Sequence, residues 1–273
     1  LGRPHIKPGQ YLVLGLGNWE PRVDRILAVE PDREPKLVKR AYSVSCPLFE
    51  DDQIVGVNDG DLQEFCIRLV DRVSDRPAML TPRLFCLKPG DRLYIGERPH
   101  GTYTLDPVTD SDTVALLASG TGEAPHNAML AELLSRGHTG QIVCATCVRY
   151  ESDLAYRSAH RELEERFSNY RYVPLTTREA WNTDAEHPDF RGRLHLQDWI
   201  TSEATRREFG EWDRDGTHFY LCGSPAMIGL PSKNDEGEDM FPEPIGMAEV
   251  LTEMGFELDR PGRPGRIHVE KYW

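Results

Sequence analysis

Long apolar runs are absent from this 273-residue sequence. No stretch approaches the roughly 20 apolar residues that cross a bilayer, so we expect no membrane span. A positively charged start followed by an apolar segment is also absent, so we expect no signal peptide and a cytoplasmic location. The net charge is −13, so the chain has no excess of basic residues. This balance argues against nucleic acid and anionic membranes as main partners.

Clustered cysteines are absent too, which argues against an iron–sulfur cluster held by four thiolates. The closest pair is Cys144 and Cys147, within the apolar segment 142–148. Residues three apart on a strand point to opposite faces, so we predict two packed core thiols and no metal site.

The Gly-x-Gly-x-x-Gly fingerprint of ordinary dinucleotide-binding dehydrogenases is missing. In its place, Gly120, Thr121 and Gly122 directly follow the apolar run 113–118. A continuous apolar run is typical of a buried parallel strand. Glycines behind such a strand allow a cofactor backbone to approach closely, so we predict a dinucleotide contact at this turn.

The pattern of apolar residues divides the chain near residue 108. Residues 1–108 contain short alternating segments separated by turns, which predict an antiparallel sheet or barrel. The strands expected there are 11–14, 25–29, 64–70 and 92–95. In residues 109–273 strands and helices alternate, which predicts an α/β doubly wound parallel sheet. The expected strands are 113–118, 142–148, 171–175, 218–222 and 267–272, and the expected helices are 127–134, 153–167, 196–209 and 248–254.

Three arginines, Arg149, Arg178 and Arg193, follow or flank strands of the second half. They fall at the carboxyl edge of the expected sheet, where doubly wound sheets bind ligands. Positive charge there suits the 2′-phosphate of NADP, so the arginines favour NADP over NAD. In the first half, the Arg40 guanidinium suits a pyrophosphate. A second pyrophosphate contact is predicted at residues 79–81, because Thr81 before Pro82 predicts an N-cap and a helix start.

Four segments together resemble bacterial-type ferredoxin/flavodoxin–NADP reductases. They are Arg40-Ala-Tyr42-Ser43, Gly120-Thr-Gly-Glu-Ala-Pro125, Cys222-Gly-Ser-Pro-Ala-Met227 and the terminal Tyr272-Trp273. The resemblance covers nearly the whole chain. It implies an FAD-binding β-barrel domain at 1–108 and an NADP-binding domain at 109–273. One departure from the family pattern is Glu123, where relatives often carry an apolar residue; its carboxylate would repel a pyrophosphate unless it turns away.

The resemblance also implies residue roles. Tyr42 would stack on the flavin, Ser43 would hydrogen-bond near its reactive nitrogen, and Trp273 would cover the ring and yield to nicotinamide. Cys222 would lie by the nicotinamide without acting as a nucleophile. Tyr150 or Tyr156 would neighbour the adenine. The FAD contacts would be Arg40, Tyr42, Ser43, Met79, Leu80, Thr81 and Trp273, and the NADP contacts Gly120, Thr121, Gly122, Arg149, Arg178 and Arg193.

The implied function is FAD-dependent transfer of electrons between NADPH and a one-electron carrier, ferredoxin or flavodoxin, by a monomeric enzyme. An NADH-dependent reductase of an oxygenase system is an alternative, although such proteins usually add an iron–sulfur module and lack the terminal Trp. A flavin relay subunit that does not use nicotinamide is the other alternative.

Two further expectations concern the first half and the surface. Residues 8–11 correspond to a point that the family reaches after one or two barrel strands, so we expect a barrel without its first strands. We also expect an extended hairpin over 18–39. An acidic carrier would need a basic patch, and the arginines available for one are Arg157, Arg161, Arg166, Arg260, Arg263 and Arg266, although solvated surfaces are the favoured reading of each cluster.

Overall fold

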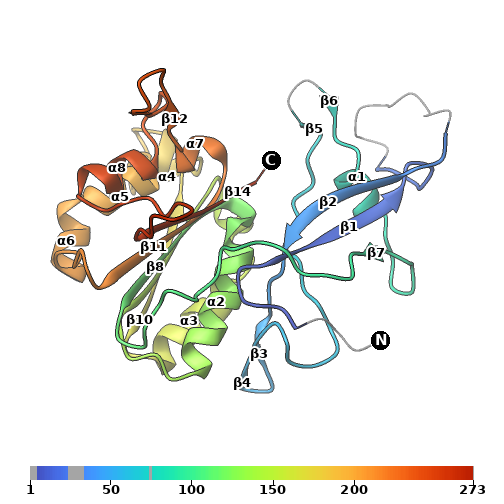
Figure 1. Ribbon diagram of the computed structural model, residues 1–273, viewed down its shortest axis with the longest axis horizontal. Helices are drawn as coiled ribbons and strands as arrows, with labels where there is room; N and C mark the ends of the chain where they lie inside the picture. The colour runs from blue at the N-terminus through green and yellow to red at the C-terminus, as the bar shows by residue number, and fades with distance from the viewer. Residues whose placement is uncertain (1–4, 24–33, 74–75, 273) are drawn as a thin grey trace.

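The computed structural model describes residues 5–23, 34–73 and 76–272, and its chain forms two parts (Figure 1). An antiparallel sheet built from the first hundred residues is followed by a five-stranded parallel sheet with helices on both faces. The predicted two-part fold class is therefore confirmed. The strand expected at 25–29, the middle of the hairpin expected over 18–39, and Trp273 lie outside the described residues.

All strands of the carboxy-terminal sheet run parallel, in the order β10-β9-β8-β11-β14. The central strand β8 is an unbroken apolar run whose middle residues, 114–118, are fully buried. Each predicted strand of this half is present within two residues of its predicted ends. The bounds are β8 Thr113–Ser119, β9 Ile142–Val148, β10 Tyr170–Thr176, β11 Thr217–Gly223 and β14 Ile267–Lys271.

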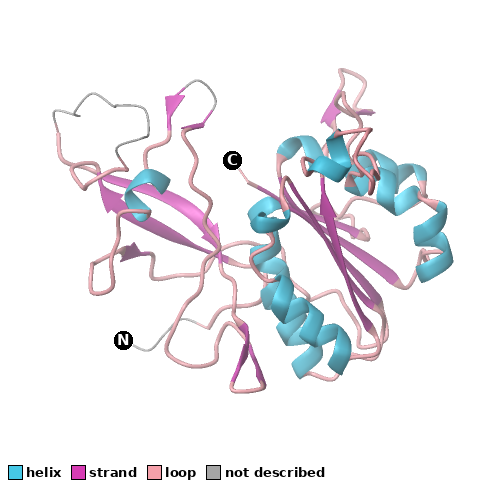
Figure 2. Cartoon of the chain, turned by 180° about the vertical axis from the view of Figure 1, so that it is seen from behind, coloured by secondary structure: helices cyan, strands magenta, loops and turns pink. Residues whose placement is uncertain are grey.

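The two faces of this sheet bury separate clusters (Figure 2). One face packs against α2 (Glu123–Ser135) and α3 (Arg157–Arg166), and the other against α5 (Leu196–Thr201), α7 (Pro225–Ile228) and α8 (Met247–Glu253). Cys144 belongs to the first cluster and Cys147 packs against the second, so the prediction of two core thiols on opposite faces is confirmed.

Two of the predicted helices differ from the structure. The expected helix 196–209 is divided into α5 and α6 (Glu203–Phe209), because Ser202 between them has extended backbone angles and its hydroxyl accepts a hydrogen bond from the Thr205 N–H. The expected helix at 153–167 begins only at Arg157. Residues Glu151–Asp153 form a separate 3₁₀ turn, η2, after which Leu154 leaves helical geometry.

The antiparallel sheet has the order β2-β1-β7, with β1 (Tyr11–Gly17) in the centre, β2 (Leu37–Ser43) on one side and the short β7 (Tyr94–Ile95) on the other. Two hairpins accompany it: β3 (Leu48–Glu50) with β4 (Gln53–Val55), and β5 (Arg72–Val73) with β6 (Arg76–Pro77). The described strands leave the sheet open at β2 and β7.

Two local predictions in this part are wrong. Residues 64–70 form no strand, and only Glu64 makes an isolated bridge, to Ser45. Thr81 is not an N-cap but the first residue of α1 (Thr81–Leu84), with Leu80 in the cap position. The Thr81 hydroxyl lies 3.4 Å from the Val70 N and 3.5 Å from the Val70 O, so it ties the helix to residue 70 instead of capping it.

Helix α2, in green in Figure 1, lies between the two sheets and joins them into one apolar cluster. Polar contacts cross the same interface. His126 on α2 is 2% exposed, and its Nε2 lies 2.8 Å from the Tyr103 hydroxyl. Tyr220 on β11 donates to the Thr104 carbonyl at 2.9 Å. The relative placement of the two parts is therefore fixed by packing and by directed hydrogen bonds.

We expect His126 to make the protein sensitive to acid, because burial lowers its pKa from 6.5 to about 3. Below pH 6.5 the unfolded chain binds a proton at this residue that the folded chain excludes, so stability falls as the pH falls. The loss from His126 between pH 7 and pH 5 is about 2 kcal/mol. Urea unfolding of the protein and of His126→Gln at both pH values measures it: the loss should be about 2 kcal/mol smaller in the variant, and equal losses would contradict the prediction.

Candidate functional site

The carboxyl ends of the parallel strands meet at one edge of the sheet, and the strand order reverses between β8 and β11. This point is where ligands of open α/β sheets bind, because the connections leave it in opposite directions. Gly120, Thr121 and Gly122 form the 3₁₀ turn η1 directly after β8, and Gly223 ends β11 beside them. The predicted dinucleotide turn thus lies at the point where the strand order of the sheet reverses.

The glycines of this edge are required by close backbone approach. A Cβ on Gly122 would lie 2.2 Å from the Cys222 carbonyl oxygen, so only glycine lets η1 pack against the end of β11. A Cβ on Gly223 would lie 2.2 Å from the Ser119 hydroxyl, which accepts the Ser224 N–H at 2.9 Å. Gly120, with φ +56°, has no atom within 4 Å of its Cβ position and leaves open space where a cofactor backbone fits.

Glu123, the departure from the family pattern, turns into the protein. It is 4% exposed, and its Oε1 accepts hydrogen bonds from Thr146 on β9 at 3.0 Å and from Tyr172 on β10 at 3.0 Å. The Nε2 of His160 on α3 lies 3.1 Å from the same oxygen, and the other ring nitrogen of His160 lies 2.8 Å from the Tyr170 hydroxyl. The charge is therefore held away from the glycine turn and anchors α2 to its neighbours.

The three arginines lie at the same edge of the sheet. Arg149 follows β9 and Arg178 follows β10, and the Arg178 N–H donates to the Arg149 carbonyl at 2.9 Å. Arg193 belongs to the segment 184–195 between α4 (Ala180–Thr183) and α5. All three are exposed, and within the described ranges no carboxylate forms an ion pair with them. They form an exposed cationic group of the kind that a phosphate needs.

The two tyrosines considered as adenine neighbours have different environments. Tyr150 is 44% exposed, directly after Arg149. The Tyr156 hydroxyl donates to Glu64 at 2.7 Å and lies 3.1 Å from the Ser45 hydroxyl, so Tyr156 is engaged with the amino-terminal part. Of the two, Tyr150 is the one left accessible beside the arginines.

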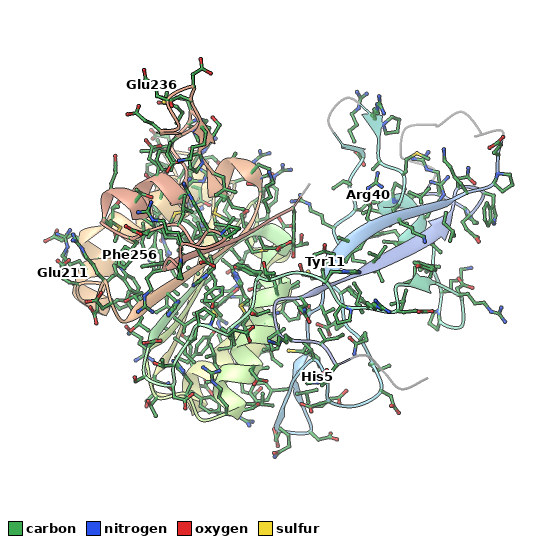
Figure 3. All side chains as sticks on the ribbon, in the orientation of Figure 1. His5, Tyr11, Arg40, Glu211, Glu236 and Phe256 are labelled. Carbon is green, nitrogen blue, oxygen red and sulfur yellow. The ribbon has the colours of Figure 1, made fainter. Side chains whose placement is uncertain are left out.

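Arg40, Tyr42 and Ser43 all belong to β2, on which Figure 3 labels Arg40, and Ser43 is the last residue of the strand. Arg40 is exposed, and its guanidinium donates to the carbonyl of its neighbour, Lys39, at 2.7 Å. Tyr42 is half-buried, and burial raises its pKa to about 12. The strand therefore offers a cation and an aromatic ring, and Ser43, 5% exposed, follows them at its end.

Further positive charge lies around residues 78–81. Arg83 on α1 donates to the Met79 carbonyl and, at 2.6 Å, to the Asn18 carbonyl; Arg22 donates to the Ala78 carbonyl at 2.9 Å. The Nε atoms of both arginines are buried and have no hydrogen-bond partner. Burial and the neighbouring Arg22 charge lower the pKa of Arg83. Unsatisfied donors on two adjacent guanidinium groups suit an anion beside Met79, Leu80 and Thr81.

The predicted flavin and nicotinamide residues meet around Tyr272, which sequence reasoning did not select as a site residue. The Tyr272 side chain lies near Ser43 of β2 and Cys222 of β11, both of which affect its pKa, and its hydroxyl donates to the Thr121 carbonyl at 3.4 Å. Burial raises the pKa of Tyr272 well above its usual value. The signal that could have identified it is its place next to the chain-end Trp273, whose own position lies outside the described residues.

Cys222 is fully buried, and burial raises the pKa of its thiol far above the ordinary value. A thiol that is protonated at neutral pH is a poor nucleophile. This agrees with the prediction that Cys222 has no nucleophilic role.

The candidate arginines for a basic patch are largely paired with the protein's own groups. Arg157 pairs with Glu151, and Arg166 with Asp52 and Glu162. Arg260 pairs with Asp239, Arg263 with Glu257, and Arg266 contacts His218 and the Asp215 carbonyl. Among the described residues, five of these six arginines therefore contact the protein's own groups, and Arg161 forms no ion pair. In the same part of the chain, no helix is long and apolar enough to span a membrane, and no group of three or more ligating side chains suits a metal ion.

Comparison with known proteins agrees with this geometry. Residues 116–233 match the family model of the oxidoreductase NAD-binding domain. The chain is 28% identical to ferredoxin–NADP reductase of Pseudomonas aeruginosa over 97% of its own length and 86% of the relative's. It is 26% identical to flavodoxin/ferredoxin–NADP reductase of Buchnera aphidicola over 71% of its length and 67% of the relative's. The chain is thus similar to ferredoxin/flavodoxin–NADP reductases over most of its length.

A solved structure supports the same fold. The chain aligns with a ferredoxin NADP⁺ reductase from Neisseria gonorrhoeae, described with bound FAD and NADP, at a TM-score of 0.68. The alignment covers 98% of this chain and 87% of the other at 19% identity. The similarity spans both parts of the molecule, so this chain shares the two-part fold of that structure.

Proposed function

We propose that this protein is an FAD-dependent reductase that takes electrons from NADPH and passes them to a small one-electron carrier of the ferredoxin or flavodoxin class. The observation that carries the proposal is the meeting of Ser43, Cys222 and Tyr272, which brings the predicted flavin side of one part against the predicted nicotinamide side of the other. The names of the relatives support the same activity.

The residues present fit FAD. Arg40 and the donors around Met79, Leu80 and Thr81 would hold the pyrophosphate, and the unsatisfied Nε atoms of Arg22 and Arg83 place positive charge beside it. Tyr42 would contact the ring system and Ser43 would donate a hydrogen bond to it. When bound, FAD supplies the exchange between two-electron and one-electron chemistry, while the protein supplies position and electrostatics.

The residues present also fit NADP. Gly120 leaves open space where a side chain would otherwise project, so Gly120, Thr121 and Gly122 would admit the dinucleotide backbone. Arg149, Arg178 and Arg193 would bind the 2′-phosphate, and Tyr150 would lie against the adenine. Cys222 would pack beside the nicotinamide, and the ring of Tyr272 would help to exclude water from the same place. Trp273 would cover the flavin.

The proposal extends to the organisation and setting of the protein. The FAD-binding domain would be residues 1–108 and the NADP-binding domain residues 109–273. All six cysteines are unpaired, which suits the reducing interior of a cell and a cytoplasmic enzyme. Five of the six arginines considered for a carrier-docking patch contact the protein's own groups, and neither cluster forms part of the proposal.

Anaerobic reduction of the purified protein tests the function. We expect a flavin absorption spectrum, directly or after incubation with FAD, and bleaching at least about tenfold faster with NADPH than with NADH at equal concentrations. Faster bleaching by NADH would identify an oxygenase-type reductase instead. A flavin spectrum that neither nucleotide bleaches would indicate a relay subunit, and failure to take up FAD would overturn the proposal as a whole.

A further inference from the structure

One buried amide side chain connects the segments that carry two of the arginines. Asn182 lies on α4 and is 7% exposed. Its Oδ1 accepts hydrogen bonds from the Thr176 hydroxyl at 2.9 Å and from the Glu179 N–H at 3.2 Å. Its Nδ2 donates to the Gly192 carbonyl at 3.0 Å. Each of these bonds ends on a residue within two positions of Arg178 or next to Arg193.

The segment that carries Arg193 has few other attachments near that residue. Residues 184–195 contain no regular structure. Within the described chain, two backbone hydrogen bonds tie this segment back to α4, from the Asp184 N–H to the Ala180 carbonyl and from the Arg191 N–H to the Trp181 carbonyl, both at 2.8 Å. The Asn182–Gly192 bond is the attachment closest to Arg193. Without it, the Arg193 guanidinium would sample more positions before meeting a phosphate, which weakens binding through the entropy of ordering.

The Oδ1 atom of the Asn182 amide holds the backbone around Arg178. Thr176 ends β10, and the Glu179 N–H directly follows Arg178, so the Asn182 oxygen holds the chain on both sides of this arginine. Arg178 is in turn linked to Arg149 through backbone. The three cationic segments therefore form one connected unit, and the link between Arg178 and Arg193 is a side chain, not a backbone ladder.

We propose that Asn182 is a positioning residue that sets the preference for a 2′-phosphorylated adenine nucleotide by holding Arg193 in register with Arg178. The inference rests on the proposed NADPH-dependent function. The buried amide fits this role because it alone donates to one segment and accepts from the other. An aliphatic side chain could fill the volume but would leave the Gly192 carbonyl and the Glu179 N–H without this partner.

Binding of nucleotide fragments to the FAD-loaded protein tests the role without depending on turnover. We expect Asn182→Ala to raise the Kd of 2′-phospho-AMP about tenfold, as expected for a lost ordering contact, while the Kd of AMP changes much less. Titration calorimetry measures both. In an Arg193→Ala background, Asn182→Ala should weaken 2′-phospho-AMP binding by a clearly smaller factor, because part of its effect acts through that arginine.

A matched control is available at the opposite end of β10. Asn169 also joins two segments, donating to the His138 carbonyl at 2.9 Å and the Gly140 carbonyl at 2.8 Å. Asn169→Ala should leave the ratio of the two Kd values unchanged. If Asn182→Ala does not fold, Asn182→Ser, which keeps a small polar group, gives the same comparison.

The outcomes separate this inference from the function on which it rests. If Asn182→Ala leaves the ratio of the Kd values of 2′-phospho-AMP and AMP unchanged, the positioning role is wrong. The same holds if Asn169→Ala shifts that ratio equally. In both cases the NADPH preference stands. Equal binding of 2′-phospho-AMP and AMP by the unaltered protein overturns the proposed preference, and this inference with it.

Discussion

Replacing Arg178 with alanine should lower kcat/KM for NADPH, relative to that for NADH, by about 10- to 100-fold. A hydrogen bond to a charged group contributes about 1.5–3 kcal/mol, and each 1.4 kcal/mol is a factor of ten. Arg178 has no carboxylate partner among the described residues, so its charge is available to a phosphate. Because NADH has no 2′-phosphate, the kcat/KM for NADH should fall less. Steady-state rates with ferricyanide as the electron acceptor measure both values without the natural carrier.

Arg171 provides the control for this prediction, because it is an exposed arginine near the amino end of β10, the strand that Arg178 follows. Its guanidinium hydrogen-bonds with the Tyr170 carbonyl at 2.7 Å, far from the carboxyl edge of the sheet. Arg171→Ala should leave the NADPH to NADH ratio within about twofold, which corresponds to less than ~0.5 kcal/mol. An Arg178→Ala variant that keeps the full ratio would place the 2′-phosphate elsewhere.

Replacing Glu123 with alanine should destabilise the protein by about 2–4 kcal/mol, because buried donors on Thr146, Tyr172 and His160 would lose their shared acceptor. Glu123→Gln keeps a carbonyl oxygen at the same place and should lose less. Urea unfolding with FAD held at a fixed excess measures the difference, since a ligand that binds the folded state alters apparent stability. A Glu123→Ala variant within about 0.5 kcal/mol of the unaltered protein would contradict this account of the network.

A combined variant separates the loss of the carboxylate from the penalty of unpaired donors. Glu123→Leu alone should be strongly destabilising. Adding Tyr172→Phe and Thr146→Val removes two of the stranded hydroxyls, and buried polar groups removed together with their partner cost little. The triple variant should therefore recover part of the stability lost in Glu123→Leu. Failure to recover would mean that the cavity or the change in charge, not the unpaired donors, dominates the cost.

Apolar patterning predicted the parallel sheet well because burial on both faces leaves a continuous apolar run in the sequence. The run 113–118 and the segment 142–148 both became strands near the predicted ends. Shorter elements were less predictable. The Ser202 break was signalled only by one capping side chain, and Thr81 has a typical N-cap sequence but uses its hydroxyl on Val70, eleven residues earlier.

The site residues also divide into those that the sequence could predict and those that it could not. The glycine turn, the three arginines and Arg40-x-Tyr42-Ser43 were visible in the sequence because each has a local signature. Tyr272 and Asn182 were not, since their partners lie far away in the chain or on irregular segments. The direction of the Glu123 side chain was also undecided, because a carboxylate beside a glycine turn can face the ligand or the core.

The sequence by itself determined the fold class, the order of the elements and the residue types offered to a flavin and a nicotinamide nucleotide, because these follow from periodicity and local motifs. Only the tertiary structure decided that Glu123 is buried against Thr146, His160 and Tyr172. It also decided that Tyr272 joins Ser43 to Cys222, and that Asn182 ties two of the arginine-bearing segments together. The contacts of Glu123 and Tyr272 join residues distant in the chain that packing of the sheets and α2 brings together, and the Asn182 contact depends on the path of a segment without regular structure.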